Sequence, residues 1–177
     1  VAQGVGRMAG LLGLGNYIMY YDANNVQLST TVEEVLNEDI AGKYRAWGWN
    51  VISIDGHNPD QIREALTAAG RETERPTLII GRTVMGKGAR GANGESFENK
   101  VSTHGQPLSA AGADIAATIS NLGGNPDDPF AIFPQSRKLY EARAKELRNW
   151  VAWMKEEEAK WRRESPELAG KLDSFLS

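Results

Sequence analysis

The spacing of hydrophobic positions changes several times along the chain, and each change marks the boundary of a predicted element. A short, continuous apolar run predicts a buried strand at residues 16–21, and further short apolar strands are predicted at residues 49–54 and 77–83. Apolar residues at helical spacing predict helices at residues 1–14, 33–47 and 59–69. Helices that alternate with short apolar strands predict an α/β fold, in which a parallel sheet carries helices on both faces.

The first predicted helix is unusually rich in small residues, among them Gly4, Gly6, Ala9 and Gly10. A helix exposed to solvent avoids so many glycines, because each one lowers helix stability. We therefore expect the backbone of this helix to pack closely against a neighbouring element.

The helix that starts at Pro59 has clear end signals, with Asn58 as its cap and Gly70 expected just after its last residue. Its predicted buried stripe consists of Ile62, Leu66 and Ala69.

The second half of the chain changes in character. Residues 84–109 form a long loop without a periodic pattern, which is typical of a lid or a binding loop. After a Pro-rich connector, an amphipathic helix is predicted over residues 136–163, and a last short helix starts at Pro166. We interpret residues 1–125 as an α/β domain and residues 126–177 as a connector and helical tail that lead to a further domain.

Composition limits the possible partners. The 177 residues are 41% hydrophobic and 24% charged, with a net charge of −3, which is ordinary for a globular protein. An acidic balance gives no reason to expect nucleic acid or an anionic membrane surface as a partner. The absence of cysteine excludes disulfides and thiolate metal sites. With no apolar run of spanning length and no signal peptide, the expected location is the cytoplasm.

Polar residues gather where the predicted strands end. Asp22 and Asn24 follow the first strand, His57 follows the second, and Met85 follows the third. In parallel sheets ligands bind beyond the carboxyl ends of the strands, so these residues are candidates for one shared site. The alternative for Asp22 and Asn24 is a local turn closed by their own side chains, and for His57 a turn residue before the Asn58 cap is the preferred interpretation.

Four motifs occur in an order that resembles the transketolases: YDANNVQLS, WGWNVISIDGHNPDQIREAL, TLIIGRTVMGKGA and STHGQPLS. The chain resembles the C-terminal half of the thiamine-diphosphate-binding (pyrophosphate) domain of that family, strongly over residues 1–135 and more loosely in the tail. The resemblance implies transfer of a two-carbon ketol unit from a ketose phosphate to an aldose phosphate in the pentose phosphate pathway, with thiamine diphosphate as cofactor.

The resemblance also assigns roles to particular residues. It implies that the Asn24 side chain and the Val26 main-chain carbonyl bind a divalent cation, Mg²⁺ or Ca²⁺, which holds the diphosphate. Met85 matches a position that lines the cofactor pocket. His104, in the SxHG motif, matches a catalytic histidine near the diphosphate and the reacting end of the substrate. A histidine in a loop beside glycine is also a reasonable hydrogen-bond donor or proton shuttle from its own chemistry.

Three departures from the family pattern shape the expected partners. The Gly-Asp-Gly part of the cofactor motif, expected just before Val1, is absent, and so is the pyrimidine-binding domain with its activating glutamate. Gly4 stands where many transketolases have an interface glutamate. We therefore expect this chain to be inactive alone and to need the remaining transketolase domains or a partner subunit, with a homodimer as the complete form.

Two other functions fit the same motifs. One is another thiamine-diphosphate enzyme of the same layout, such as a 1-deoxyxylulose-5-phosphate synthase or a dihydroxyacetone synthase. The other is a noncatalytic module that only folds and docks.

Overall fold

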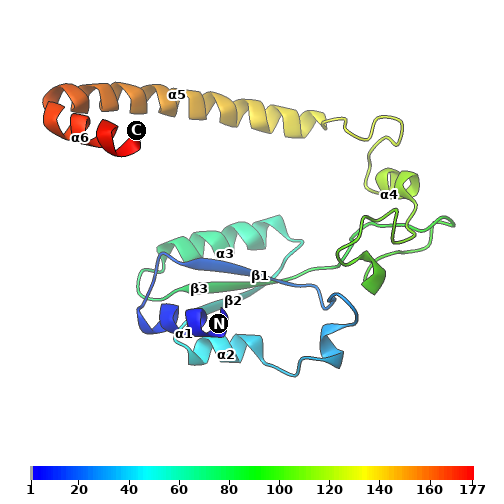
Figure 1. Ribbon diagram of the computed structural model, residues 1–177. Coiled ribbons are helices and arrows are strands. Elements are labelled where there is room, and N and C mark those ends of the chain that lie inside the picture. The colour runs from blue at the N-terminus through cyan, green and yellow to red at the C-terminus, as the bar shows by residue number, and fades with distance from the viewer. Residues whose placement is uncertain (1) are drawn as a thin grey trace. The chain divides into compact units, whose positions relative to one another are not determined.

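The computed structural model describes residues 2–177, and the chain divides into two compact units, one ending at Pro129 and the next beginning at Phe130. The first unit contains a three-stranded sheet of β1 (Ile18–Ala23), β2 (Asn50–Asp55) and β3 (Thr77–Arg82) (Figure 1). The strands lie in the order β1-β3-β2, and both pairings are parallel. This confirms the predicted parallel α/β sheet.

Helices cover both faces of this sheet (Figure 1). On one face α3 (Pro59–Arg71) buries Ala65 and Ala69 against Ile54 and Ile79 of the strands. On the other face lie α1 (Ala2–Leu11) and α2 (Ile40–Ala46), whose core cluster is built from Ala9, Trp49 and Leu78 together with partly buried neighbours of α2. Two thin apolar layers therefore hold the central strand β3 in place.

The close backbone packing expected of α1 is present. A Cβ atom added at Gly10 would lie 1.7 Å from the carbonyl oxygen of Trp47, so only glycine fits there. The indole Nε1 of Trp49 donates a hydrogen bond of 2.8 Å to the Gly6 carbonyl. At Gly4, by contrast, nothing lies within 4 Å of an added Cβ. Gly6 and Gly10 thus both serve the contact between α1 and the turn that leads into β2.

The predicted helix over residues 33–47 was wrong in its first half. A short 3₁₀ helix, η1 (Val32–Glu34), comes first, and α2 begins only after Asp39. The Asp39 side chain accepts a hydrogen bond of 2.9 Å from the Gly42 amide, so it caps the helix and fixes its start.

Two details of α3 also differ from the prediction. Leu66 is 51% exposed, because Ala65 and Ala69, four residues apart, face the sheet and Leu66 lies one step further around the helix. Gly70 lies inside α3, which ends at Arg71.

Residues 84–122 are more ordered than the predicted loop. They contain a 3₁₀ helix, η2 (Val101–Thr103), and a helix that the sequence pattern did not indicate, α4 (Ile115–Asn121). The amide of Arg90 donates to Thr118 Oγ1 at 3.0 Å, and Asn121 Nδ2 donates to the Gly88 carbonyl at 2.9 Å. Side chains of α4 therefore hold the first part of this segment.

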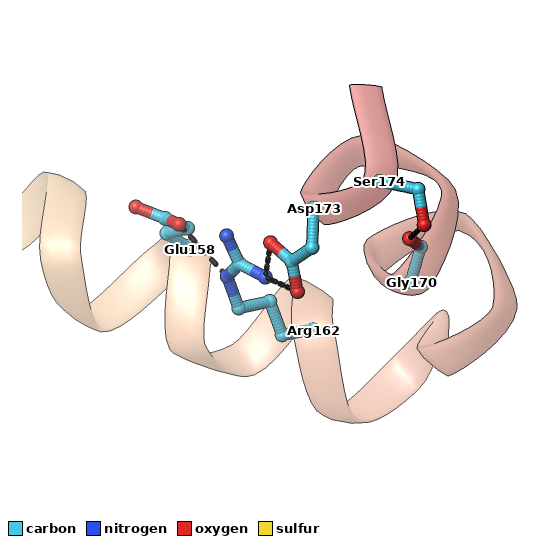
Figure 2. A network of polar contacts seen from close by, with 5 residues as sticks. All are labelled: Glu158, Arg162, Gly170, Asp173 and Ser174. Atoms are coloured by element: carbon cyan, nitrogen blue, oxygen red, sulfur yellow. Dashed lines mark hydrogen bonds and ion pairs between the residues drawn. The ribbon is translucent and has the colours of Figure 1, made fainter. Parts of the chain in front are cut away.

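The second unit consists of α5 (Pro134–Glu164) and α6 (Pro166–Leu176), close to the predicted helices. Arg162 joins them: its Nε donates to Glu158 at 2.8 Å, and its Nη1 donates to both oxygens of Asp173 at 2.9 and 3.1 Å (Figure 2). Within α6, Ser174 Oγ donates to the Gly170 carbonyl at 2.9 Å. The predicted domain boundary after residue 125 stays a prediction. None of the helices within residues 2–177 combines the length and apolarity needed to cross a membrane.

Candidate functional site

The three strands end at one edge of the sheet, as predicted from their parallel order. In the register of the sheet, Asp22 of β1 lies beside Gly81, and Asp55 of β2 lies beside Arg82. The loops that follow β1 and β3 both extend beyond this edge (Figure 1). The candidate residues that follow each strand therefore lie at the same end of the sheet, beyond the carboxyl ends of the strands.

Asn24 has a fixed orientation at the end of β1. Its Nδ2 donates to Asp22 Oδ2 at 3.1 Å, and its Oδ1 accepts from the Val26 amide at 2.9 Å. Asp22 is itself held by the hydroxyl of Thr83, which donates to its Oδ1. The turn closed by side chains, which the sequence left open as an alternative, is present. An amide oxygen has two lone pairs, so Oδ1 keeps one for a second partner.

Val26 occupies a tight turn next to Asn24. Asn25 has a positive φ of 60°, a conformation that asparagine tolerates better than most residues. The bridge between Val26 and Thr31 uses the Gln27 amide, which donates to the Thr30 carbonyl at 3.0 Å, and the Asn25 carbonyl, which accepts from Val32 at 3.1 Å. The carbonyl of Val26 takes no part in this bridge. The two oxygens assigned to the cation are thus two residues apart, on one turn beyond β1.

Met85 lies in the segment that leaves β3. Its side chain is half-buried, and its carbonyl accepts a hydrogen bond of 2.9 Å from the Asn99 amide. A Cβ added at Gly86 would lie 3.9 Å from Leu108 Cδ2 and from Thr103 Oγ1. The chain around Met85 therefore packs against the segment that contains the SxHG motif.

His104 directly follows η2, and its side chain contains the most unusual polar atom of the site. Its Nδ1 is buried and has no hydrogen-bond partner within the part of the chain that the structure describes. A Cβ added at the next residue, Gly105, would lie 3.6 Å from Leu28 Cδ1. The segments that carry Val26, Met85 and His104 therefore lie against one another, although they are far apart in the sequence.

Two residues take part in this edge in ways that the sequence pattern did not show. His57 is more than a turn residue, because its Nε2 accepts a hydrogen bond of 2.8 Å from the Val84 amide. Burial raises the pKa of Tyr20 above its ordinary value of 10.0, and the charges of Asp22 and Asp55 raise it further. The hydroxyl of Tyr20 also lies above Gly81, where an added Cβ would come within 1.7 Å of it. Each interaction connects residues in or just after different strands, so the local sequence pattern does not predict it.

The donor set restricts which ion this edge can bind. Across residues 2–177, the structure brings no three His, Cys, Asp or Glu side chains close enough to hold one metal ion together. An amide oxygen and a main-chain carbonyl are hard ligands, of the kind that Mg²⁺ and Ca²⁺ take, and they leave room for phosphate oxygens. The residues present fit a cation that arrives with a diphosphate. The ligand roles of Asn24 and Val26, and the roles of Met85 and His104, stay predictions.

Comparison with known proteins gives a consistent result. Residues 1–177 match the family model described as transketolase, thiamine diphosphate binding domain. The chain is 36% identical over 174 residues to transketolase 2 of Xanthobacter flavus, covering 96% of this chain and 24% of that protein. It is 33% identical over 178 residues to transketolase 2 of Escherichia coli, covering all of this chain and 25% of that protein.

Solved structures agree with these relatives. The crystal structure of a Pichia stipitis transketolase in complex with sedoheptulose-7-phosphate matches 97% of this chain and 24% of that chain, with a TM-score of 0.79 and 26% identity. The transketolase of Campylobacter jejuni matches 82% of this chain and 23% of that chain, with a TM-score of 0.67 and 30% identity.

The chain thus spans about a quarter of the length of the relatives that it matches. The expectation that it corresponds to the C-terminal half of the cofactor domain is not confirmed, because the matched model describes the N-terminal part of transketolases. The family itself is confirmed along the whole chain: this protein belongs to the transketolases, in their thiamine diphosphate binding domain.

Proposed function

We propose that this chain binds thiamine diphosphate through a divalent cation, as part of an enzyme that transfers two-carbon ketol groups between sugar phosphates. The observation that carries the proposal is the meeting of the Val26, Met85 and His104 segments at the carboxyl edge of the sheet, within a chain whose family is described by this cofactor. The chemistry that thiamine diphosphate supplies when bound is stabilisation of the carbanion formed by carbon–carbon cleavage.

Asn24 and Val26 are the proposed cation ligands. The Asn24 Nδ2 atom donates a hydrogen bond of 3.1 Å to Asp22, which fixes the orientation of the side-chain amide. The Oδ1 atom is therefore held in one position before the cation binds. A ligand held in place before binding loses less conformational entropy when the cation arrives. This preorganisation supports Asn24 as an anchor for the cation and, through it, for the diphosphate.

His104 is the proposed catalytic residue. A buried imidazole nitrogen without a partner costs free energy, and such atoms in native proteins commonly await a ligand or a water molecule. We propose that His104 hydrogen-bonds charge that develops at the reacting end of the substrate, while the half-buried Met85 forms an apolar wall of the cofactor pocket.

Sugar phosphates are the proposed substrates, and a homodimer in the cytoplasm is the proposed form. The substrate class is supported by the Pichia stipitis relative, whose structure contains sedoheptulose-7-phosphate. Because the chain spans about a quarter of its relatives, we propose that further transketolase domains complete the active site.

The test is Asn24→Ala in the protein at its native length, with thiamine diphosphate affinity measured by titration at several Mg²⁺ concentrations. We expect the affinity to fall at least tenfold (about 1.4 kcal/mol) and excess Mg²⁺ to restore part of it, because the remaining oxygen ligands can still bind the ion. The matched control is Asn125→Ala, which removes a similar side-chain turn, to the Asp127 amide at 3.1 Å, elsewhere in the unit. Unchanged affinity in Asn24→Ala, or an equal loss in both variants, contradicts the ligand assignment.

A further inference from the structure

The segment that leaves β3 is held from both neighbouring strands. From the β1 side, Asp22 accepts a hydrogen bond from the Thr83 hydroxyl. From the β2 side, the Gly56 amide donates to the Arg82 carbonyl at 2.8 Å, and His57 Nε2 accepts from the Val84 amide at 2.8 Å. The next residue after these contacts is Met85. The path of the chain into the proposed cofactor pocket is therefore set just before the pocket begins.

His57 makes this contact from a fixed base. Its own amide donates to Asp55 Oδ1 at 2.9 Å, which ties it to the end of β2. The next residue, Asn58, caps α3 by accepting from the Asp60 and Gln61 amides at 3.0 and 3.2 Å. The imidazole therefore projects from a rigid junction between a strand and a helix.

The chemistry of the contact requires an acceptor at this position. Val84 is half-buried, and its amide has no role in the ladder of the sheet, which ends at Arg82. An aromatic ring without a nitrogen would fill the same space but would leave this amide without a partner, which is costly in a buried setting. An imidazole can accept at Nε2 only in the neutral form that carries its proton on Nδ1.

We propose that His57 is a positioning residue of the cofactor site: through the Val84 amide it fixes the segment that places Met85 against the cofactor. The part of this proposal that concerns the cofactor rests on the proposed function above. His57 acts through the main chain of Val84, so its side chain needs no contact with the cofactor or the substrate.

The experiment compares His57→Phe and His57→Gln in the protein at its native length. Phenylalanine keeps an aromatic ring and removes the acceptor. Glutamine supplies Oε1 at the same number of bonds from Cα as Nε2 of histidine, so it can restore the bond. Hydrogen–deuterium exchange of a peptide that covers Val84 reports the hydrogen bond directly, and titration with thiamine diphosphate reports the site.

We expect His57→Phe to speed exchange at Val84 and to weaken thiamine diphosphate binding by roughly tenfold, the usual effect of a lost buried hydrogen bond. His57→Gln should bring both readouts back to within about threefold of the wild type, a residual difference of less than 1 kcal/mol. The control Asp39→Ala removes the cap of α2, on the other face of the sheet, where Asp39 accepts from the Gly42 amide at 2.9 Å; it should lower thermal stability and leave both readouts near the wild type.

Each result has a definite meaning. Unchanged exchange at Val84 in His57→Phe, or no recovery in His57→Gln, overturns the positioning role. Changed exchange with unchanged cofactor affinity confines His57 to the local structure and overturns its link to the cofactor. If the wild-type protein itself does not bind thiamine diphosphate, the proposed function fails, and the exchange data still decide whether His57 holds Val84.

Discussion

Replacing Gly10 by alanine tests the packing of α1 more sharply than any other single change. The added Cβ would lie 1.7 Å from the Trp47 carbonyl oxygen and 3.3 Å from Trp49 Cδ1. An ordinary contact needs about 3.5 Å, so the shortfall at the carbonyl is about 1.8 Å. Because the obstacle is main chain and not the end of a flexible side chain, α1 itself has to move.

The expected cost follows from two opposing terms. Overpacking of this kind costs up to about 3 kcal/mol. Alanine favours a helix over glycine by about 1 kcal/mol, which offsets part of it. The net loss in the free energy of unfolding is therefore about 2 kcal/mol, and for a domain of this size the Tm falls by about 4–8 °C. Displacing α1 also breaks the hydrogen bond from Trp49 to the Gly6 carbonyl and moves Ala9 out of the core.

The assay is thermal unfolding followed by circular dichroism, with Gly4→Ala as the matched control. Both substitutions are the same chemical change in the same helix. At Gly4 nothing lies within 4 Å of the new methyl group, so only the gain in helix propensity remains, about 0.5–1 kcal/mol of added stability.

The two variants should therefore change stability in opposite directions. If Gly10→Ala is as stable as the wild type, or gains as much as Gly4→Ala, then α1 does not pack on the Trp47 main chain and the reasoning is refuted.

Two further predictions concern charge. The pKa of Tyr20 is raised, so the folded state keeps the phenol proton more strongly than the unfolded state; this contribution is fully present below pH 10 and is lost as pH rises through the folded pKa. Tyr20→Phe should therefore flatten the loss of stability above pH 10, as measured by urea unfolding at stepped pH, and an unchanged slope would count against a raised pKa of Tyr20. In the second unit, Arg162→Met removes both hydrogen bonds to Asp173 and the bond to Glu158, so hydrogen exchange in α6 should become faster. Equal exchange in both proteins would show that apolar packing alone holds the two helices together.

The strands were predictable because each has a short run of apolar side chains, and only their ends moved. β1 runs on through Asp22 and Ala23, residues that the pattern assigned to a turn. Pairing with Gly81 and Arg82 uses the backbone alone, so it continues where the apolar signal has stopped.

The parts of the structure that the sequence did not predict depend on contacts between distant residues. The α4 helix, with the sequence IAATISN, is short and weakly amphipathic; it is capped by Asp114, which accepts from the Ala117 amide at 2.7 Å, and tied to the preceding loop through Thr118. The bond between His57 and Val84 likewise joins residues that follow different strands. Local periodicity contains no information about such pairs. The site residues came from the resemblance to a family, and their roles stay predictions.

The strand order β1-β3-β2 has a consequence for how the chain folds. Within residues 2–177, every ladder of the sheet includes β3, which is the last of the three strands to be synthesised; β1 and β2 pair with it and not with each other. In the register of the sheet, Ile18 and Asn50 both pair with the same residue of β3, Thr77. Contacts between distant residues form slowly, because loop closure costs entropy before the contact returns any free energy. We therefore expect β1 and β2 to form none of the strand pairings seen within residues 2–177 until β3 has emerged from the ribosome. Substitutions that weaken β3 should slow the assembly of the entire sheet in a single kinetic phase, which stopped-flow refolding would detect.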